Sequence, residues 1–382
     1  MTTTATRNVG ARAAWTEPAV ERSPRVSVIV PVYNGGQDFV RCLAALRSST
    51  EIPADSWELI VADDGSTDGS VQKARAVGGR VAPSPGARSG PAAARNAGAA
   101  VARGEVLLFV DADVLVRCDT LARMLAAFDA SPTVAAIFGS YDEHPAASNF
   151  LSQYKNLFHH YVHQTSRSEA TTFWAGCGAV RAAIFRELGG FDPRYDRPCI
   201  EDIELGYRLT RAGYAVRLCH DLQVTHLKRW TAVSMVKSDI LDRGIPWTEL
   251  LLRERAFTAD LNLQTSNRIS VVCVYLLAMA TAGALLQPLL ALAVLPLLVA
   301  LMAFNAPLYR FFLRQRGVRF TLAAAPWHWF YYAYNGVSFV IGTLVYLYHG
   351  RPTAAAVPAH ATERGGGDDL SSAALVTPLR GD

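Results

Sequence analysis

The sequence has little that could build a disulfide framework or a zinc finger. It contains six cysteines in 382 residues, and no two of them form a CxxC pair. Disulfide-rich domains and structural zinc sites both need closely spaced cysteines, so neither is expected, and a reducing, cytosolic environment fits best. The cysteines are Cys42, Cys118, Cys177, Cys199, Cys219 and Cys273.

Two further features are missing. Residues 1–24 are rich in Thr, Ala and Arg and hold no apolar run of the kind that marks a signal peptide, so we predict a disordered tail there and a cytoplasmic first domain. The net charge is only +4, and its arginines are spread over many segments with no basic helix carrying interleaved aromatics. Nucleic acid is therefore excluded as an expected partner.

Between residues 25 and 230, short apolar runs alternate with helical patterns. This alternation is typical of an α/β domain with a mostly parallel sheet covered by helices. The expected strands are Val26–Val30, Glu58–Ala62, Val106–Val110 and Val134–Phe138. The expected helices are Gln37–Arg47, Ser70–Val77, Pro91–Ala102 and Thr120–Phe128.

Polar residues follow three of the expected strands. Pro31–Asn34 follows the first, Asp63–Ser70 the second and Asp111–Asp113 the third. In open α/β sheets, ligands bind beyond the carboxyl ends of the strands. Two carboxylates one residue apart could hold a divalent cation and a diphosphate there. Taken alone, however, each aspartate turn is better explained as a strand-ending Asx turn or a helix cap.

The three turns in this order resemble family 2 glycosyltransferases of the GT-A fold. The resemblance extends to Ala94–Gly98 before the third strand, and to Gly189–Asp192 followed by Glu201 and Asp202. It covers roughly Arg25 to Trp230, a little over half of the chain. It implies a GT-A-type nucleotide-sugar-binding domain with a mostly parallel sheet, which we place at residues 25–230.

The resemblance also implies roles for individual residues. The base and ribose of the donor would be held by Pro31, Tyr33, Asp63, Asp64 and Asp111, with Arg95 near the donor. A divalent cation, Mg²⁺ or Mn²⁺, would be held by Asp113 and by His226, although a lone histidine is equally compatible with a structural role.

Asp202 corresponds to the catalytic base of the family. It falls in the first turn of a helix expected to run to about Arg211, where the helix dipole favours an ionised carboxylate. The alternative is that Glu201 and Asp202 only stabilise the start of that helix.

The acceptor would be contacted by Trp174, Gly176, Glu201, Arg229 and Trp230. The small residues of Trp174–Gly178 would permit close approach of a sugar. His226–Trp230 partly matches the QxxRW signature of processive synthases, with His in place of Gln, which leaves processivity in doubt. The His159, His160 and His163 cluster fits a packed helix face better than a metal or acceptor site.

The C-terminal part is apolar and points to a membrane. Residues 231–268 mix aromatic and basic residues as interfacial amphipathic helices do, although ordinary packing helices fit equally. Residues 269–349 are expected to form a transmembrane region of about three helices, at 269–286, 289–308 and 327–348. A basic loop with Arg310, Arg314, Arg316 and Arg319 would lie between the last two, and residues 350–382 are expected to be disordered.

Together these features predict an inverting, metal-assisted glycosyltransferase. It would move a sugar from a nucleotide-diphosphate donor to a hydroxyl of a lipid-linked or membrane-proximal glycan acceptor. The protein would be multi-pass in the cell membrane with its catalytic domain in the cytoplasm. The alternative is a non-catalytic, membrane-anchored scaffold that binds nucleotide-sugars. A nucleotidyltransferase is not supported, because the Gly-rich GxGxRxxxLT loop of that class is absent from this sequence. A transporter is not supported either, because the sequence has no ionisable pair within its predicted membrane helices.

Overall fold

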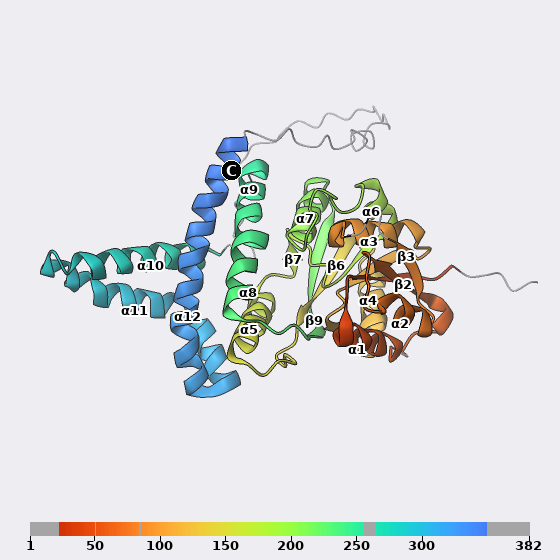
Figure 1. Ribbon diagram of the computed structural model, residues 1–382, viewed down its shortest axis with the longest axis horizontal. Coiled ribbons are helices and arrows are strands. Elements are labelled where there is room, and N and C mark those ends of the chain that lie inside the picture. Colours follow the sequence, from red (N-terminus) through yellow and green to blue (C-terminus); the bar gives the residue numbers. More distant parts are fainter. Residues whose placement is uncertain (1–22, 50, 84–85, 87, 256–263, 350–382) are drawn as a thin grey trace, which may run out of the picture.

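The computed structural model describes the whole chain except residues 1–22, 50, 84–85, 87, 256–263 and 350–382 (Figure 1). Almost all of the tail predicted at 1–24, and all of the tail predicted at 350–382, lie outside the described residues. The described part consists of an α/β region built on a nine-stranded sheet, followed by a purely helical C-terminal region.

The sheet is mixed, with strand order β3-β2-β1-β4-β8-β6-β9-β5 and β7 paired to β9. The strands β3, β2, β1 and β4 run parallel, as do β6 and β9, whereas β8 runs antiparallel between β4 and β6. The bounds are β1 Val26–Val32, β2 Trp57–Asp63, β3 Arg80–Pro83, β4 Val106–Val110, β5 Val114–Leu115, β6 Val134–Tyr141, β7 Glu169–Ala170, β8 Cys177–Arg181 and β9 Ala215–His226. The predicted α/β fold is confirmed.

Helices cover both faces of this sheet because side chains alternate along each strand. Val28 and Val30 pack on the face covered by α1, α2 and α4, and Ile29 packs on the face covered by α3, α5, α6 and α7. The bounds are α1 Gly36–Arg47, α2 Ser70–Ala76, α3 Gly90–Val101, α4 Thr120–Asp129, α5 Phe150–Thr165, α6 Ala182–Glu187 and α7 Glu201–Arg211. The four predicted helices are α1 to α4, each within a residue or two.

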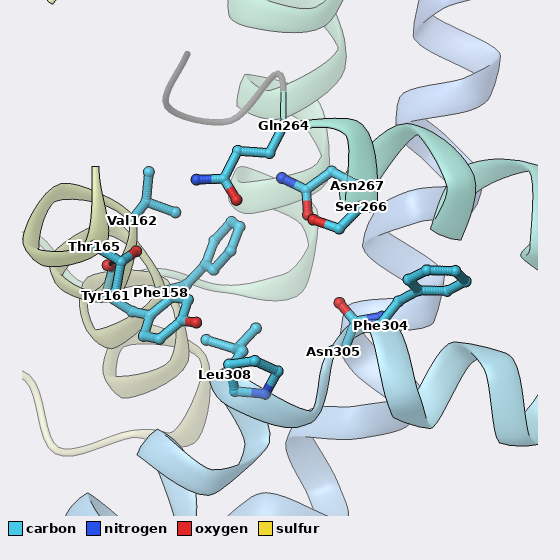
Figure 2. Close-up of a pocket in the computed structure, with 11 residues that line it drawn as sticks. Phe158, Tyr161, Val162, Thr165, Gln264, Ser266, Asn267, Phe304, Asn305 and Leu308 are labelled. Atoms are coloured by element: carbon cyan, nitrogen blue, oxygen red, sulfur yellow. Dashed lines mark hydrogen bonds between the residues drawn. The ribbon is translucent and has the colours of Figure 1, made fainter. Parts of the chain in front are cut away.

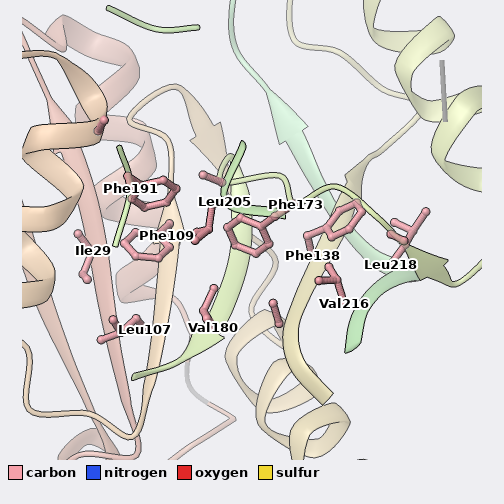
Figure 3. Close-up of a cluster of buried hydrophobic side chains, with 14 of the residues drawn as sticks. Ile29, Leu107, Phe109, Phe138, Phe173, Val180, Phe191, Leu205, Val216 and Leu218 are labelled. Atoms are coloured by element: carbon pink, nitrogen blue, oxygen red, sulfur yellow. The ribbon is translucent and has the colours of Figure 1, made fainter. Parts of the chain in front are cut away.

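Aromatic rings fill the second face near the middle of the sheet (Figure 3). Phe109 of β4 packs edge-on against Phe191 with ring centroids 5.0 Å apart, and Phe138 of β6 meets Phe173 at 6.3 Å. All four rings are almost completely buried. Removing such a side chain from a core costs about 3–5 kcal/mol, so this cluster fixes the strands from which the polar turns emerge.

The strand β8 was not predicted, and its sequence explains why. Cys177–Arg181 is short and begins with small residues, so it carries no strand pattern. Gly178 is required there, because a Cβ would collide with the backbone carbonyl of Trp174 and the ring of Phe173. The close approach places the Trp174 loop beside β4.

The helices after β9 pack against the α/β region. They are α8 Ala232–Lys237, the π-helix η2 Ser238–Gly244 and α9 Ile245–Glu254. Leu250 and Leu251 of α9 are buried with Ile200 and Tyr207 beside α7. The packing-helix alternative for residues 231–268 is therefore confirmed for α9, and the interfacial location stays a prediction.

The remaining helices are α10 Thr265–Gly283, the 3₁₀ helix η4 Pro288–Ala293, α11 Val294–Phe304 and α12 Ala306–His349. The predicted break at Gln287–Pro288 is confirmed as the end of a hairpin between α10 and α11 (Figure 1). Among the described residues, only α10 is by itself long and apolar enough to cross a membrane. The pair Pro288–Phe304 and Ala306–His349 meets the criterion together but is bent by 64°.

The predicted basic loop is wrong. Arg310, Arg314 and Arg316 lie in the first turns of α12, and the backbone is non-helical only at Gly317, with φ of 78°. Arg316 donates from Nε to Gln153 Oε1 at 2.8 Å and from Nη2 to the carbonyl of Glu143 at 2.7 Å. Helical hydrogen bonds, the contact with Gln153 of α5 and the contact with Glu143 after β6 order the segment.

Candidate active site

The first two polar turns interlock at the carboxyl ends of β1 and β2. Asn34 adopts a left-handed conformation with φ of 50°. Its N–H donates to Ser66 Oγ at 2.9 Å, and its Oδ1 accepts from the Thr67 N–H at 2.7 Å. The N–H of Gly36 donates to Asp68 Oδ2 at 2.8 Å. The two motifs that the sequence places 30 residues apart therefore form one rigid surface.

Tyr33 gives this surface an open aromatic face. Its side chain is 42% exposed, and the Arg88 guanidinium lies 5.1 Å from its ring centroid. Pro31 is partly buried just before it. Arg88 was not predicted, because it lies in a connection with no motif around it. An aromatic ring with a cation beside it suits a flat base next to a phosphate.

Asp63 and Asp64 have different roles. Asp63 stays partly exposed and accepts from the Ser66 N–H at 3.1 Å, which closes the turn. Asp64 is buried, and its two oxygens accept from the N–H groups of Ser89 at 2.7 Å and Gly90 at 2.9 Å. The cap alternative is thus realised at Asp64, which holds the start of α3, and donor contact stays a prediction for both.

Arg95 joins the third turn to the start of α7. It lies buried on α3 and donates from Nη2 to Asp111 Oδ1 at 2.7 Å and from Nη1 to Glu201 Oε1 at 2.6 Å. Asp111 remains about one-third exposed, so its carboxylate is also open to a ligand. The bridge brings the predicted donor side and the predicted acceptor side together.

Glu201 does not lie where an acceptor could reach it. It is 4% exposed, and its second oxygen accepts from the Cys199 N–H at 2.9 Å. The prediction of an acceptor contact is contradicted by this burial. The physical reason is that the buried Arg95 cation needs carboxylates in direct contact to offset the loss of water.

Asp202 is next to this bridge, at the start of α7. Its Oδ2 accepts from the Ala175 N–H at 3.1 Å and its Oδ1 from the Ile203 N–H at 2.8 Å. Burial, followed by the charge of Glu201, raises the pKa of Asp202 to about 7, against the lowering effect of Arg95 and the two N–H donors. The expectation that the helix dipole favours the ionised form is therefore wrong, because desolvation and a like charge outweigh it.

Asp113 and His226 approach each other, with Oδ2 and Nε2 3.6 Å apart. The pairing of Val114 with His226 between β5 and β9, and a hydrogen bond from the Leu227 N–H to the Asp113 carbonyl at 2.8 Å, fix this approach. Burial would raise the pKa of Asp113, but His226 and Lys228 lower it below its ordinary value. The carboxylate therefore stays ionised at neutral pH.

This pair supplies two groups of the kind that bind divalent cations. The described residues contain no cluster of three or more His, Cys, Asp or Glu that could hold a metal ion. A carboxylate oxygen and an imidazole nitrogen are nevertheless donors that Mn²⁺ or Mg²⁺ accepts when phosphate oxygens and water complete its shell. The residues present fit a cation that arrives with a diphosphate.

Tyr141 packs between His226 and Trp174 at the candidate site, and it was not predicted. Its ring stacks on His226 with centroids 4.4 Å apart and meets Trp174 edge-on at 4.7 Å. The apolar run was expected to end at Phe138, and β6 continues three residues further through Gly139 and Ser140. Gly176 lies under the Trp174 indole, where a Cβ would collide with the ring. Its small size admits this indole, and contact with a sugar stays a prediction.

The residues after β9 are divided between surface and core. Arg229 is exposed, whereas Trp230 is only 4% exposed. The backbone N–H of Trp230 donates to Ser152 Oγ at 2.7 Å, and its backbone carbonyl accepts from Asn149 Nδ2 at 2.8 Å. Trp230 therefore anchors the segment on α5, which contradicts its predicted acceptor contact. Arg229 stays a predicted contact.

The histidines of α5 form a packed face, as the sequence favoured. His160 is buried and its Nδ1 lies 2.7 Å from the Tyr141 carbonyl oxygen. Burial lowers the pKa of His163 to about 4 and that of His159 well below its ordinary value. Both are neutral at pH 7, which suits a role in packing beneath Tyr141 and Trp174.

Comparison with known proteins finds similarity at several levels. The family model described as Glycosyl transferase family 2 matches residues 27–189. The O-antigen chain rhamnosyltransferase RfbN of Salmonella typhimurium is 26% identical over 218 residues, which cover 54% of this chain and 68% of the relative. The validoxylamine A glucosyltransferase of Streptomyces hygroscopicus subsp. limoneus is 28% identical over 256 residues, covering 54% of this chain and 52% of that protein.

Among solved structures, the fold is similar to the mannosyltransferase PcManGT of Pyrobaculum calidifontis, described in complex with GDP-Man and Mn²⁺. The TM-score is 0.51 at 19% identity, over 88% of this chain and 91% of the other. At this identity the likeness establishes the fold, and it extends into the helical C-terminal region of this chain.

Proposed function

Because the chain carries a family 2 glycosyltransferase domain with the GT-A fold, we propose that it inverts the anomeric carbon of a nucleotide-diphosphate sugar in a single displacement. The observation that carries this proposal is the Arg95 bridge. It joins Asp111, on the proposed donor side, to Glu201, which directly precedes the candidate base Asp202 at the start of α7.

Asp202 would take the proton from the acceptor hydroxyl. The acceptor oxygen forms a bond to the anomeric carbon while the bond from that carbon to the diphosphate oxygen breaks, and the nucleoside diphosphate leaves with the electron pair. A base with a pKa near 7 suits this step, because it is largely available at neutral pH and still binds the proton. Attack opposite the leaving group inverts the configuration.

The leaving group would be held by the three polar turns. Tyr33 and Arg88 offer a face for the base, and the partly exposed carboxylates of Asp63 and Asp111 can accept from ribose hydroxyls or base N–H groups. Asp113 and His226 would hold a divalent cation, which when bound neutralises charge that develops on the diphosphate.

The proposed acceptor is lipid-linked or lies close to a membrane, with the catalytic domain on the cytoplasmic side. The support is the apolar C-terminal region, in which α10 is long enough to cross a bilayer, and the relative named as an O-antigen chain rhamnosyltransferase. The sugar and the nucleotide depend on loop shape, which the shared motifs do not determine.

The first test separates the base from donor binding. Asp202→Asn should lose transfer by about 10²–10⁴-fold while calorimetry shows unchanged binding of the nucleotide. Product configuration read by NMR should be inverted relative to the donor. Full activity in Asp202→Asn would refute the assignment, and nucleotide binding without any turnover in the unaltered chain would favour the scaffold alternative.

The second test addresses the cation. UDP, GDP and dTDP are titrated into detergent-purified protein with and without Mn²⁺. One nucleotide should bind in a metal-dependent manner, and Asp113→Ala should abolish the dependence. Asp129→Ala, at the exposed end of α4, is the matched control and should leave the dependence unchanged. Equal binding with and without Mn²⁺ would contradict a metal-assisted site.

A further inference from the structure

The α10–α11 hairpin, residues 265–304, projects away from the rest of the protein (Figure 1). Its end is apolar and exposed, with Leu285 88% and Leu286 90% exposed, and Leu289, Leu292 and Leu295 also largely exposed. Residues 269–309 contain no Asp, Glu, Lys or Arg. Soluble surfaces rarely carry so large a contiguous apolar patch, so this one needs an apolar partner.

The base of the hairpin, in contrast to its apolar end, carries polar and basic side chains. A cavity of about 100 Å³ lies there between α5 and the ends of the two arms, lined by polar side chains including Gln264, Asn267 and Asn305 (Figure 2). Asn305 donates to Ser270 Oγ at 3.1 Å, which joins the two arms. Arg268 precedes the uncharged run and Arg310 and Arg314 follow it, all three exposed. Such a basic collar matches anionic headgroups.

The arms are long enough to reach deep into a bilayer. The 19 residues of α10 span about 28 Å, and η4 with α11 spans a similar distance. The hydrocarbon core is about 30 Å thick. The arms also close tightly near the end, because a Cβ on Gly283 would lie 2.6 Å from Leu290 Cδ1.

The turn of the hairpin lacks the polar residues that would suit contact with water on the far side of a bilayer. A hairpin that crosses completely exposes its turn to solvent, and turns in water are polar. Here Gln287 is the only polar side chain between Thr281 and Asn305. One uncharged amide is far less costly in hydrocarbon than a charged group.

The path of α12 decides which apolar segment inserts. The 64° bend lies where α11 meets α12, and α12 bends again at Gly317. The apolar part of α12 at residues 327–348 follows this second bend and runs across the base of the hairpin (Figure 1). If the hairpin enters perpendicular to the bilayer, α12 cannot cross and lies near the surface.

We propose that the chain is held by a re-entrant hairpin, with α10 and α11 entering a bilayer of anionic lipid from the side of the catalytic domain and the turn at Leu285–Leu290 remaining within the hydrocarbon. In this arrangement one inserted hairpin takes the place of the three transmembrane helices expected from sequence. The proposal rests on the proposed bilayer partner and does not depend on the proposed transfer reaction. The basic collar and the packed base of α12 hold the active site at the headgroup level.

The test uses the full chain added to preformed vesicles of phosphatidylcholine and phosphatidylglycerol, which places the catalytic domain outside. Leu285→Cys is compared with Val233→Cys, a residue 78% exposed on α8. A membrane-impermeant maleimide is supplied outside or trapped inside, and labelling at the substituted position is read by peptide mass spectrometry. Val233→Cys should be labelled from outside, and Leu285→Cys from neither side until detergent is added.

Labelling of Leu285→Cys from inside would show a complete crossing, and labelling from outside would show no insertion; either overturns the proposal. In vesicle flotation, Leu285→Asp with Leu286→Asp should reduce binding at least tenfold, whereas Val233→Asp should not. Nucleotide binding in detergent shows that each variant is folded. Neither readout needs turnover, so a failure of the proposed transfer reaction would leave both results unchanged.

Discussion

At the scale of single residues, the site depends on how burial and charge act on Asp202. Its position in the first turn of α7 was predictable, because the Glu-Asp pair precedes an amphipathic helix. Its pKa was not predictable, since the raising effect comes from burial beneath the Trp174 loop and from Glu201, which Arg95 orients from another helix. The helix dipole alone therefore predicts the pKa of a carboxyl group poorly when burial and a neighbouring charge also act on it.

The raised pKa predicts opposite pH trends for activity and stability. Transfer should fall about tenfold per pH unit below pH 7, because the base becomes protonated. Asp202 binds its proton near pH 7 when folded and near pH 4 when unfolded. Its stabilising contribution is therefore complete below pH 4 and is lost as the pH rises through 7.

Asp202→Asn should consequently be more stable than the unaltered chain at pH 8, by about 4 kcal/mol, with the difference shrinking towards pH 4. Thermal unfolding measured at pH 5 and pH 8 checks this. A variant that is equally less stable at both pH values would show that the carboxylate is not destabilised by its site.

Arg95 offers a second prediction at this scale. Lys in its place could reach only one of Asp111 and Glu201, which leaves the other carboxylate without its cation. We expect Arg95→Lys to destabilise the fold by about 3 kcal/mol and to reduce transfer at least tenfold. Arg123→Lys is the control, since Arg123 also bridges two carboxylates, Asp119 and Asp221, but its own side chain is 47% exposed. Equal effects in both variants would contradict a special role of burial.

At the scale of elements, the parts with a strong local pattern were predictable and the parts made by long-range contact were not. The strands β1, β2 and β4 are rich in apolar and β-branched residues, and each was located from sequence. By contrast, β8 and the end of β6 become strands only because neighbouring strands pair with them, and for the end of β6 that neighbour is β9. The same limit hid Tyr141, which lies in that added end of β6.

The contact between α5, η2 and α12 supplies a prediction for elements. Lys155 on α5 donates to Asp239 of η2 at 2.5 Å, and Tyr334 of α12 donates to the other oxygen of Asp239 at 2.8 Å. The side chains of Lys155 and Asp239 are about 5% exposed. Lys155→Met should cost about 3–5 kcal/mol, because it leaves a buried carboxylate without its cation.

The double variant Lys155→Met with Asp239→Asn should recover most of that loss, since the asparagine can still accept from Tyr334 and no charge remains. Chemical unfolding in detergent of both variants measures the difference. Additive losses in the double variant would mean that the pair contributes nothing beyond its separate side chains.

At the scale of the whole molecule, the helical C-terminal region and the catalytic region share one core. Tyr309 and Phe312 of α12 belong to the same buried cluster as Phe138 of the sheet and Leu157 of α5. His328 of α12 is hydrogen-bonded to Tyr154 Oη at 2.7 Å. The sequence suggested a boundary near residue 230 because the family resemblance ends there, but the motifs do not report which later helices fold back onto the sheet.

A shared core predicts cooperative unfolding of the two regions. Phe312→Ala, which empties a fully buried position, should cost about 3–5 kcal/mol. Loss of nucleotide binding and loss of helix signal should then shift to lower temperature together. Phe339→Ala, on the exposed side of the same helix, should move neither. Separate transitions, with nucleotide binding unaffected by Phe312→Ala, would instead mean that the catalytic domain is stable without its contacts to α12. The active site would then be free to move relative to the hairpin.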